Sequence, residues 1–170
     1  MSTEAEQFER ISTKIFQDSN AAATVVAEEI ADLIKSRSKD GKTTVLGLAT
    51  GSTPLPVYRE LIRKHREENL SFRNVITFNL DEYYGLNTDH PESYYQFMWQ
   101  RLLGHVDIPE DQVHLPSGTT ERSKVYANCS EYEQAIEEAG GLDYQILGIG
   151  RTGHIGFNEP GSTRDSKPDW

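Results

Sequence analysis

The fold of this chain is decided by the stretch Thr44-Val45-Leu46-Gly47-Leu48-Ala49-Thr50-Gly51-Ser52-Thr53-Pro54. Its first six residues form a short, almost wholly apolar run, which is typical of a strand buried on both faces of a parallel sheet. Small residues follow, and a proline suits the first turn of a helix. The stretch therefore predicts a strand, a tight turn and a helix in direct succession.

The segments on either side repeat this alternation. We expect helices over residues 21–36, 54–68, 93–103 and 124–139, and further strands over residues 75–79 and 144–149. An irregular N-terminal arm is expected over residues 1–19, followed by one α/β domain over residues 20–170. The pattern predicts an open, mostly parallel sheet flanked by helices, a Rossmann-like three-layer fold. Ligands of such sheets bind beyond the carboxyl ends of the strands.

Composition excludes several classes of protein. The chain has 170 residues, 36% of them hydrophobic, and a formal net charge of -10, which disfavours binding to nucleic acid or to an anionic membrane surface. It contains no apolar run long enough for a membrane span, and its polar start does not resemble a signal peptide. We therefore expect a cytoplasmic protein. Its one cysteine, Cys129, predicts neither an internal disulfide nor a zinc site.

Residues 50–53 are a candidate phosphate site. Free backbone amides and hydroxyl groups at a helix start suit an anion, and the attraction acts locally even in an acidic protein. The lysine of a nucleotide P-loop is missing, so a small sugar phosphate fits better than ATP. A simple helix cap remains the alternative.

Two adjacent carboxylates follow the second predicted strand, in the segment Phe78-Asn79-Leu80-Asp81-Glu82-Tyr83-Tyr84-Gly85. Acid groups beside aromatic rings at a strand end are typical of a general base with a raised pKa. A helix cap or a solvated turn is the alternative, and a structural role is open for Glu82 in particular.

A glycine-rich segment, residues 148–161, follows the last predicted strand. Its five glycines indicate a backbone folded closely around a ligand, with His154 and Glu159 available for proton transfer. The other histidines lack such neighbours in sequence and are interpreted as surface or structural residues; they are His65, His90, His105 and His114.

Four motifs in this order resemble the glucosamine-6-phosphate deaminase family over about residues 20–166. They are Leu46-Gly47-Leu48-Ala49-Thr50-Gly51-Ser52-Thr53-Pro54, Phe78-Asn79-Leu80-Asp81-Glu82-Tyr83, Ser93-Tyr94-Tyr95 and Gly153-His154-Ile155-Gly156-Phe157-Asn158-Glu159-Pro160. The related 6-phosphogluconolactonases share the fold but differ after the Gly-His pair.

The resemblance implies an enzyme of amino-sugar catabolism that converts glucosamine 6-phosphate and water to fructose 6-phosphate and ammonia, classed as a hydrolase with isomerase-like chemistry. It implies that Asp81 moves a proton between C2 and C1, and that His154, with Glu159 as its partner, assists ring opening. The substrate phosphate would be bound by Thr50, Gly51, Ser52 and Thr53. A small amino-sugar phosphate is the implied partner, and no metal or organic cofactor is implied.

Two departures from the family pattern stand out. Thr152 occupies a position where most members have an aspartate, so His154 lacks that anionic neighbour. Family members also continue with more sheet and helix, so we expect a C-terminally incomplete domain with uncovered apolar surface, and possible homo-oligomers. A sugar-phosphate isomerase, a lactonase-like enzyme and a phosphosugar-binding or regulatory module remain alternatives.

Overall fold

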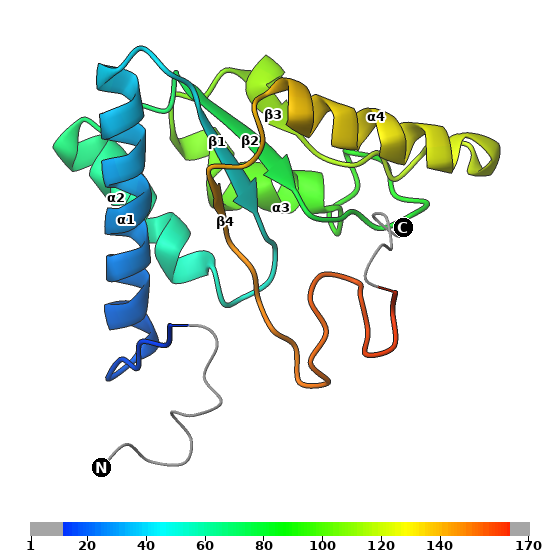
Figure 1. The fold of residues 1–170 in the computed structure, drawn as a ribbon, viewed down its shortest axis with the longest axis horizontal. Coiled ribbons are helices and arrows are strands. Elements are labelled where there is room, and N and C mark those ends of the chain that lie inside the picture. Colours follow the sequence, from blue (N-terminus) through cyan, green and yellow to red (C-terminus); the bar gives the residue numbers. More distant parts are fainter. Residues whose placement is uncertain (1–11, 164–170) are drawn as a thin grey trace.

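The computed structural model describes residues 12–163, which form a parallel sheet with helices on both faces (Figure 1). In chain order the main elements are α1 (Ser19–Lys39), β1 (Thr44–Leu48), α2 (Leu55–Glu68), β2 (Val75–Asn79), α3 (Tyr94–Arg101), β3 (Val113–His114), α4 (Val125–Glu138) and β4 (Tyr144–Gln145). No helix in this part of the chain is long and apolar enough to cross a membrane.

The sheet has the order β3-β2-β1-β4, and every pairing is parallel. β1 and β2 pair along their whole length, from Thr44 opposite Val75 to Leu48 opposite Asn79. From β1 the chain adds β2 and then β3 on one side, whereas β4 lies on the other side of β1, so the strand order reverses between β1 and β4. The predicted open parallel α/β sheet is confirmed, and its carboxyl ends beside this reversal are where such folds bind ligands.

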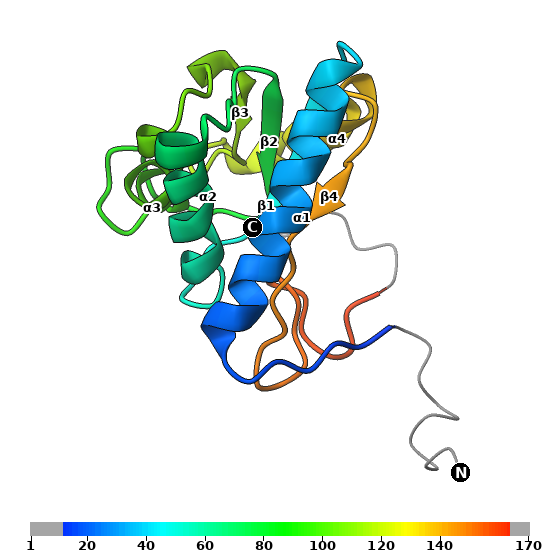
Figure 2. The same cartoon turned by 90° about the vertical axis from the view of Figure 1, so that its left-hand side faces the viewer.

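The main core lies between one face of the sheet and helices α1, α2 and α3, and Figures 1 and 2 show α1 and α2 packed side by side. Its central side chains, among them Ile30, Leu48, Tyr58 and Met98, are completely buried. On the opposite face, Phe78 of β2 packs edge-on against Tyr132 of α4, with 5.6 Å between ring centroids. Both faces are therefore covered around β1 and β2.

The helices begin where side chains can cap them. Asp18 accepts a hydrogen bond from the Ala21 amide at 2.8 Å, and Ser93 accepts one from the Gln96 amide at 3.1 Å. Such caps satisfy amides that the helix itself leaves without partners. The first helix therefore begins directly after Asp18.

The last predicted strand is wrong in length. The sequence predicts a core strand over residues 144–149, but β4 ends at Gln145, and Leu147 and Ile149 are 51% and 78% exposed. The last hydrogen bond to β1 runs from the Ile146 amide to the Gly47 carbonyl at 2.9 Å, and only β1 pairs with β4 among the described residues. An apolar run needs strands or helices on both sides to become a core strand.

The edge strand β3 and the N-terminal segment are short. β3 has only two residues and was not predicted, because a strand so short leaves no pattern in the sequence. Residues 12–17 of the expected N-terminal arm form no helix or strand, whereas Ser19, its last residue, is the first residue of α1, and residues 1–11 lie outside the described part of the chain.

Candidate active site

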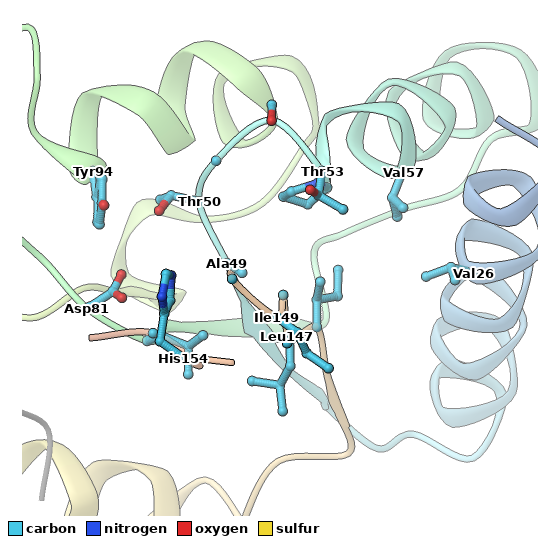
Figure 3. A pocket seen from close by; sticks show the side chains of 18 of the residues that line it. Val26, Ala49, Thr50, Thr53, Val57, Asp81, Tyr94, Leu147, Ile149 and His154 are labelled. Atoms are coloured by element: carbon cyan, nitrogen blue, oxygen red, sulfur yellow. The ribbon is translucent and has the colours of Figure 1, made fainter. Parts of the chain in front are cut away.

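A cavity of about 640 Å³ opens at the carboxyl ends of β1, β2 and β4. Figure 3 shows its two sides: Thr50, Asp81, Tyr94 and His154 lie toward one, and Val26, Val57, Leu147 and Ile149 toward the other. All three segments that the sequence singled out contribute to its lining. The cavity thus joins a polar, ionisable side to an apolar one, as small-molecule sites commonly do.

The turn after β1 forms one wall, with Thr50, Gly51, Ser52 and Thr53 all lining the cavity. Gly51 has a φ of 96°, a conformation that side chains other than glycine rarely adopt, and this lets the chain turn directly into α2. In the described part of the chain no side chain caps α2, whose first residues follow Pro54. The Leu55 amide donates to the Ser52 carbonyl at 3.4 Å, and Pro54 and Pro56 have no amide hydrogen, so the amides that remain for an anion are those of the turn itself, at Gly51, Ser52 and Thr53.

Asp81 lies two residues beyond β2 and is mostly buried in the cavity wall. Burial and, to a smaller extent, the neighbouring Glu82 carboxylate raise the pKa of Asp81 to about 6. A carboxylate with a pKa close to neutral can accept and return a proton, as a general base must. The backbone of Gly156 approaches it closely, since a Cβ there would lie 3.4 Å from Asp81 Oδ2.

Glu82 points away from this chemistry. Its side chain is 3% exposed and accepts hydrogen bonds from three backbone amides at 2.9 to 3.0 Å, those of Tyr83, Tyr94 and Tyr95. Two of these amides belong to the first turn of α3, so Glu82 anchors that helix start. The two adjacent carboxylates therefore differ in role: Asp81 borders the cavity, whereas the contacts of Glu82 agree with the structural role considered for it.

Hydrogen bonds between nearby residues of the glycine-rich loop position His154. The Gly150 amide donates to the His154 carbonyl at 2.9 Å, and the Gly153 amide donates to the Gly150 carbonyl at 3.0 Å. Gly150 also has to be a glycine, because a Cβ there would lie 2.1 Å from His154 Cε1. The ring consequently rests on the Gly150 backbone and borders the cavity.

Glu159 does not border the cavity but contacts His154. A tight turn bonded between Ile155 and Asn158 brings the chain back, and Glu159 Oε1 then lies 3.3 Å from His154 Nδ1. Thr152 Oγ1 lies 2.8 Å from His154 Nδ1 and donates to Glu159 Oε2 at 2.8 Å. With a threonine at position 152, the anionic neighbour of His154 is Glu159, and the Thr152 hydroxyl lies between the two side chains.

Three aromatic rings beside Asp81 were not predicted as site residues. Tyr83, Tyr94 and Phe157 all line the cavity, with ring centroids 4.8 to 6.3 Å apart. Burial raises the pKa of Tyr94, and the adjacent Tyr83 adds to this. All three residues belong to the family motifs in the sequence. The sequence alone does not show which of several neighbouring tyrosines faces a cavity, because that depends on the path of the loop.

The remaining histidines lie away from the cavity. His114 stacks on Phe78 with 4.5 Å between ring centroids, and burial lowers the pKa of His114. His65 contacts the Leu70 carbonyl at 2.7 Å, and His105 contacts the Gln100 carbonyl at 3.0 Å. These contacts agree with the structural role expected for these three.

Comparison with known proteins identifies relatives over most of the chain. Residues 17–162 match the family described as glucosamine-6-phosphate isomerases/6-phosphogluconolactonase. The chain is 49% identical over 142 residues to a glucosamine-6-phosphate deaminase of Thermoanaerobacter sp. (strain X514), and 49% identical over 156 residues to glucosamine-6-phosphate deaminase 2 of Giardia intestinalis. These alignments cover 84% and 92% of this chain but 55% and 57% of the relatives, so the chain spans about half their length.

Two solved structures carry the same fold. One, described as a monomeric glucosamine-6-phosphate deaminase, aligns with a TM-score of 0.85 and 44% identity, covering 92% of this chain and 62% of its own. A 6-phosphogluconolactonase from Thermotoga maritima aligns with a TM-score of 0.68 and 26% identity, covering 84% of this chain and 61% of its own.

The expected classification as a hydrolase is wrong. The family is described by isomerases and a lactonase, and the relatives are named deaminases, which supports a lyase or isomerase type of deaminase. The parallel sheet, the four motifs and the match over residues 17–162 lead to the same assignment. The chain belongs to the family of glucosamine-6-phosphate isomerases and 6-phosphogluconolactonases.

Proposed function

We propose that this chain carries the phosphosugar-handling part of an enzyme that converts glucosamine 6-phosphate and water to fructose 6-phosphate and ammonia. One observation carries the proposal: Asp81, with its pKa raised to about 6, borders the same cavity as His154 and the turn over residues 50–53. A base, a second proton-transfer group and an anion site therefore meet where a small molecule fits.

The substrate phosphate would bind at the turn after β1. The turn over residues 50–53 lines the cavity, and the positive dipole end of α2 follows it directly. Anchoring the phosphate at this wall would place the sugar carbons toward Asp81 and His154, which lie on the same side of the cavity as Thr50.

Asp81 would act as the base. The opened amino sugar has a proton on C2 next to the C1 aldehyde, and Asp81 would take this proton and return it to C1. The amine nitrogen loses a proton and the C1 oxygen gains one, so that C1 becomes a CH₂OH group and C2 an imine carbon. Water then adds to C2, and the C2–N bond breaks to release ammonia and leave the ketone. His154 would assist ring opening by accepting the proton of the C1 hydroxyl and passing it to the ring oxygen, with Glu159 Oε1 3.3 Å from the other ring nitrogen, Nδ1. These steps use side chains only, without a metal or organic cofactor.

The partner in this proposal is a small amino-sugar phosphate, and the location is the cytoplasm. The charge of -10 supports a site that binds phosphate locally rather than a nucleic acid surface. Self-association stays a prediction that rests on the exposed Leu147 and Ile149. It contrasts with the relative described as monomeric.

Incubating the purified chain with glucosamine 6-phosphate and assaying ammonia and fructose 6-phosphate tests the proposal. We expect both products in equal amounts. Hydrolysis of 6-phosphogluconolactone without ammonia release would instead favour the lactonase alternative, which the shared family description supports. Binding of glucosamine 6-phosphate in calorimetry without any product would favour a binding module, an alternative supported by the match to only about half of the relatives' length.

A further inference from the structure

The Thr152 hydroxyl lies between the two ionisable groups of the glycine-rich loop. Its Oγ1 is 2.8 Å from Glu159 Oε2 and 2.8 Å from His154 Nδ1. A hydroxyl has one hydrogen, and an ionised carboxylate can only accept. Thr152 therefore donates to Glu159 and presents an oxygen lone pair to His154.

This arrangement determines which ring nitrogen of His154 carries hydrogen. Nδ1 faces two acceptors, the Thr152 hydroxyl oxygen at 2.8 Å and Glu159 Oε1 at 3.3 Å. A neutral imidazole has a single N–H, and the hydrogen bond at one nitrogen fixes the state of the other. With the hydrogen on Nδ1, Nε2 keeps its lone pair.

Nε2 has no hydrogen-bond partner among residues 12–163, and the side chain of His154, which borders the cavity, is 40% exposed. The ring lies over the Gly150 backbone, since a Cβ there would lie within 2.5 Å of Cε1, Nε2 and Nδ1. A ring whose Nε2 carries no hydrogen can accept a proton at that nitrogen. The other tautomer would present an N–H instead and could not.

We propose that Thr152 is a positioning residue whose hydroxyl selects the Nδ1–H tautomer of His154 and thereby keeps Nε2 ready to accept a proton from the substrate. The part that concerns the substrate rests on the proposed function, whereas the tautomer is a property of the protein alone. A threonine performs this task without adding charge. An aspartate at position 152 would accept from Nδ1, but it could not donate to Glu159 and would place a second carboxylate beside it.

The experiment compares Thr152→Val with Thr152→Ser in the full chain, with histidines labelled by ¹³C and ¹⁵N. Valine keeps the shape and removes the hydroxyl, whereas serine keeps the hydroxyl. The ring ¹⁵N shifts of neutral His154, assigned by their loss in His154→Asn, report the tautomer. We expect Nδ1–H in the unmodified chain and in Thr152→Ser, and a shift toward Nε2–H in Thr152→Val.

An unchanged Nδ1–H tautomer in Thr152→Val would overturn the proposal, because Glu159 alone would then suffice. Nε2–H in the unmodified chain would overturn it as well. In the deaminase assay we expect kcat of Thr152→Val to fall about 10- to 100-fold with little change in KM, and Thr152→Ser to restore it. An unmodified chain without deaminase activity would count against the proposed function, while the ring shifts would still decide the tautomer.

Discussion

Asp81 and His154 border the same cavity but are held by different kinds of structure. Asp81 follows a five-residue buried strand paired along its whole length with β1, and Tyr132 donates to the Asn79 carbonyl at 2.9 Å where that strand ends. His154 follows a two-residue strand, in a loop held by its own hydrogen bonds. One group is positioned by the sheet, the other by contacts a few residues away.

The turn after β1 belongs to the first kind. Ala49, just before it, donates from its amide to the hydroxyl of the buried Tyr58 at 3.2 Å, and this hydroxyl donates back to the Ala49 carbonyl. A tyrosine hydroxyl thus holds the end of each of the two long strands, that of the buried Tyr58 at β1 and that of the partly buried Tyr132 at β2. The core therefore positions the proposed phosphate site and base, whereas the geometry of His154 depends on single loop residues.

The largest expected effect concerns the adjacent acids. Asp81→Asn should lower turnover by about 10²- to 10⁴-fold, since it removes the proposed base, while the fold is kept. Glu82→Gln should instead lower stability by about 1–3 kcal/mol, because an amide group would face backbone amides that now donate to a carboxylate. Exchange of the substrate C2 proton in deuterated water and thermal melts separate the two effects. Retained exchange in Asp81→Asn with loss in Glu82→Gln would reverse the roles.

The next effect tests the loop. In Gly150→Ala the new Cβ would lie 2.1 Å from the His154 ring, so the ring has to move, and a displacement of about 1 Å can cost 100-fold in rate. Gly148→Ala is the matched control, because no heavy atom lies within 4 Å of its Cβ and neither glycine has a positive φ. We expect turnover to fall about 10- to 100-fold in the first variant only. Equal turnover in both would show that the position of His154 does not matter.

A smaller effect is expected at the turn over residues 50–53. Ser52→Asp puts a negative charge in the proposed phosphate site, and repulsion of about 1–4 kcal/mol at contact distance weakens binding roughly tenfold or more. Thr119→Asp adds the same charge at an exposed position that does not line the cavity. Calorimetry with glucosamine 6-phosphate measures both affinities. If Ser52→Asp binds as tightly as Thr119→Asp, the turn is only a helix start.

The same contrast explains what could be predicted from the sequence. β1 and β2 are predictable because their apolar runs are buried between neighbours, and Asp81 and residues 50–53 follow them at fixed positions. Residues 144–149 have the same kind of run, yet only Tyr144 and Gln145 form a strand, because pairing depends on what lies alongside. The Thr152 contact was not predictable, since it depends on Gly153, whose φ is 86°, and on the turn from Ile155 to Asn158.

The smallest effect separates the cost of burying Asp81 from its role in catalysis. Burial raises the pKa of Asp81 from 3.8 to about 6, so the folded chain binds this proton more tightly than the unfolded chain does. The stability that the protonated form contributes is complete below pH 3.8 and is lost as the pH rises through about 6. Asp81→Asn has no proton to lose there.

Its melting temperature should therefore exceed that of the unmodified chain by a few degrees at pH 8, and the difference should vanish below pH 3.8, since about 1 kcal/mol shifts the melting of a chain this size by roughly 2–4 °C. Asp89→Asn, at an exposed carboxylate, is the control and should show no such dependence on pH. A melting difference that is equal at both pH values would mean that Asp81 is not desolvated in the folded chain. The core would then position this carboxylate without raising its pKa.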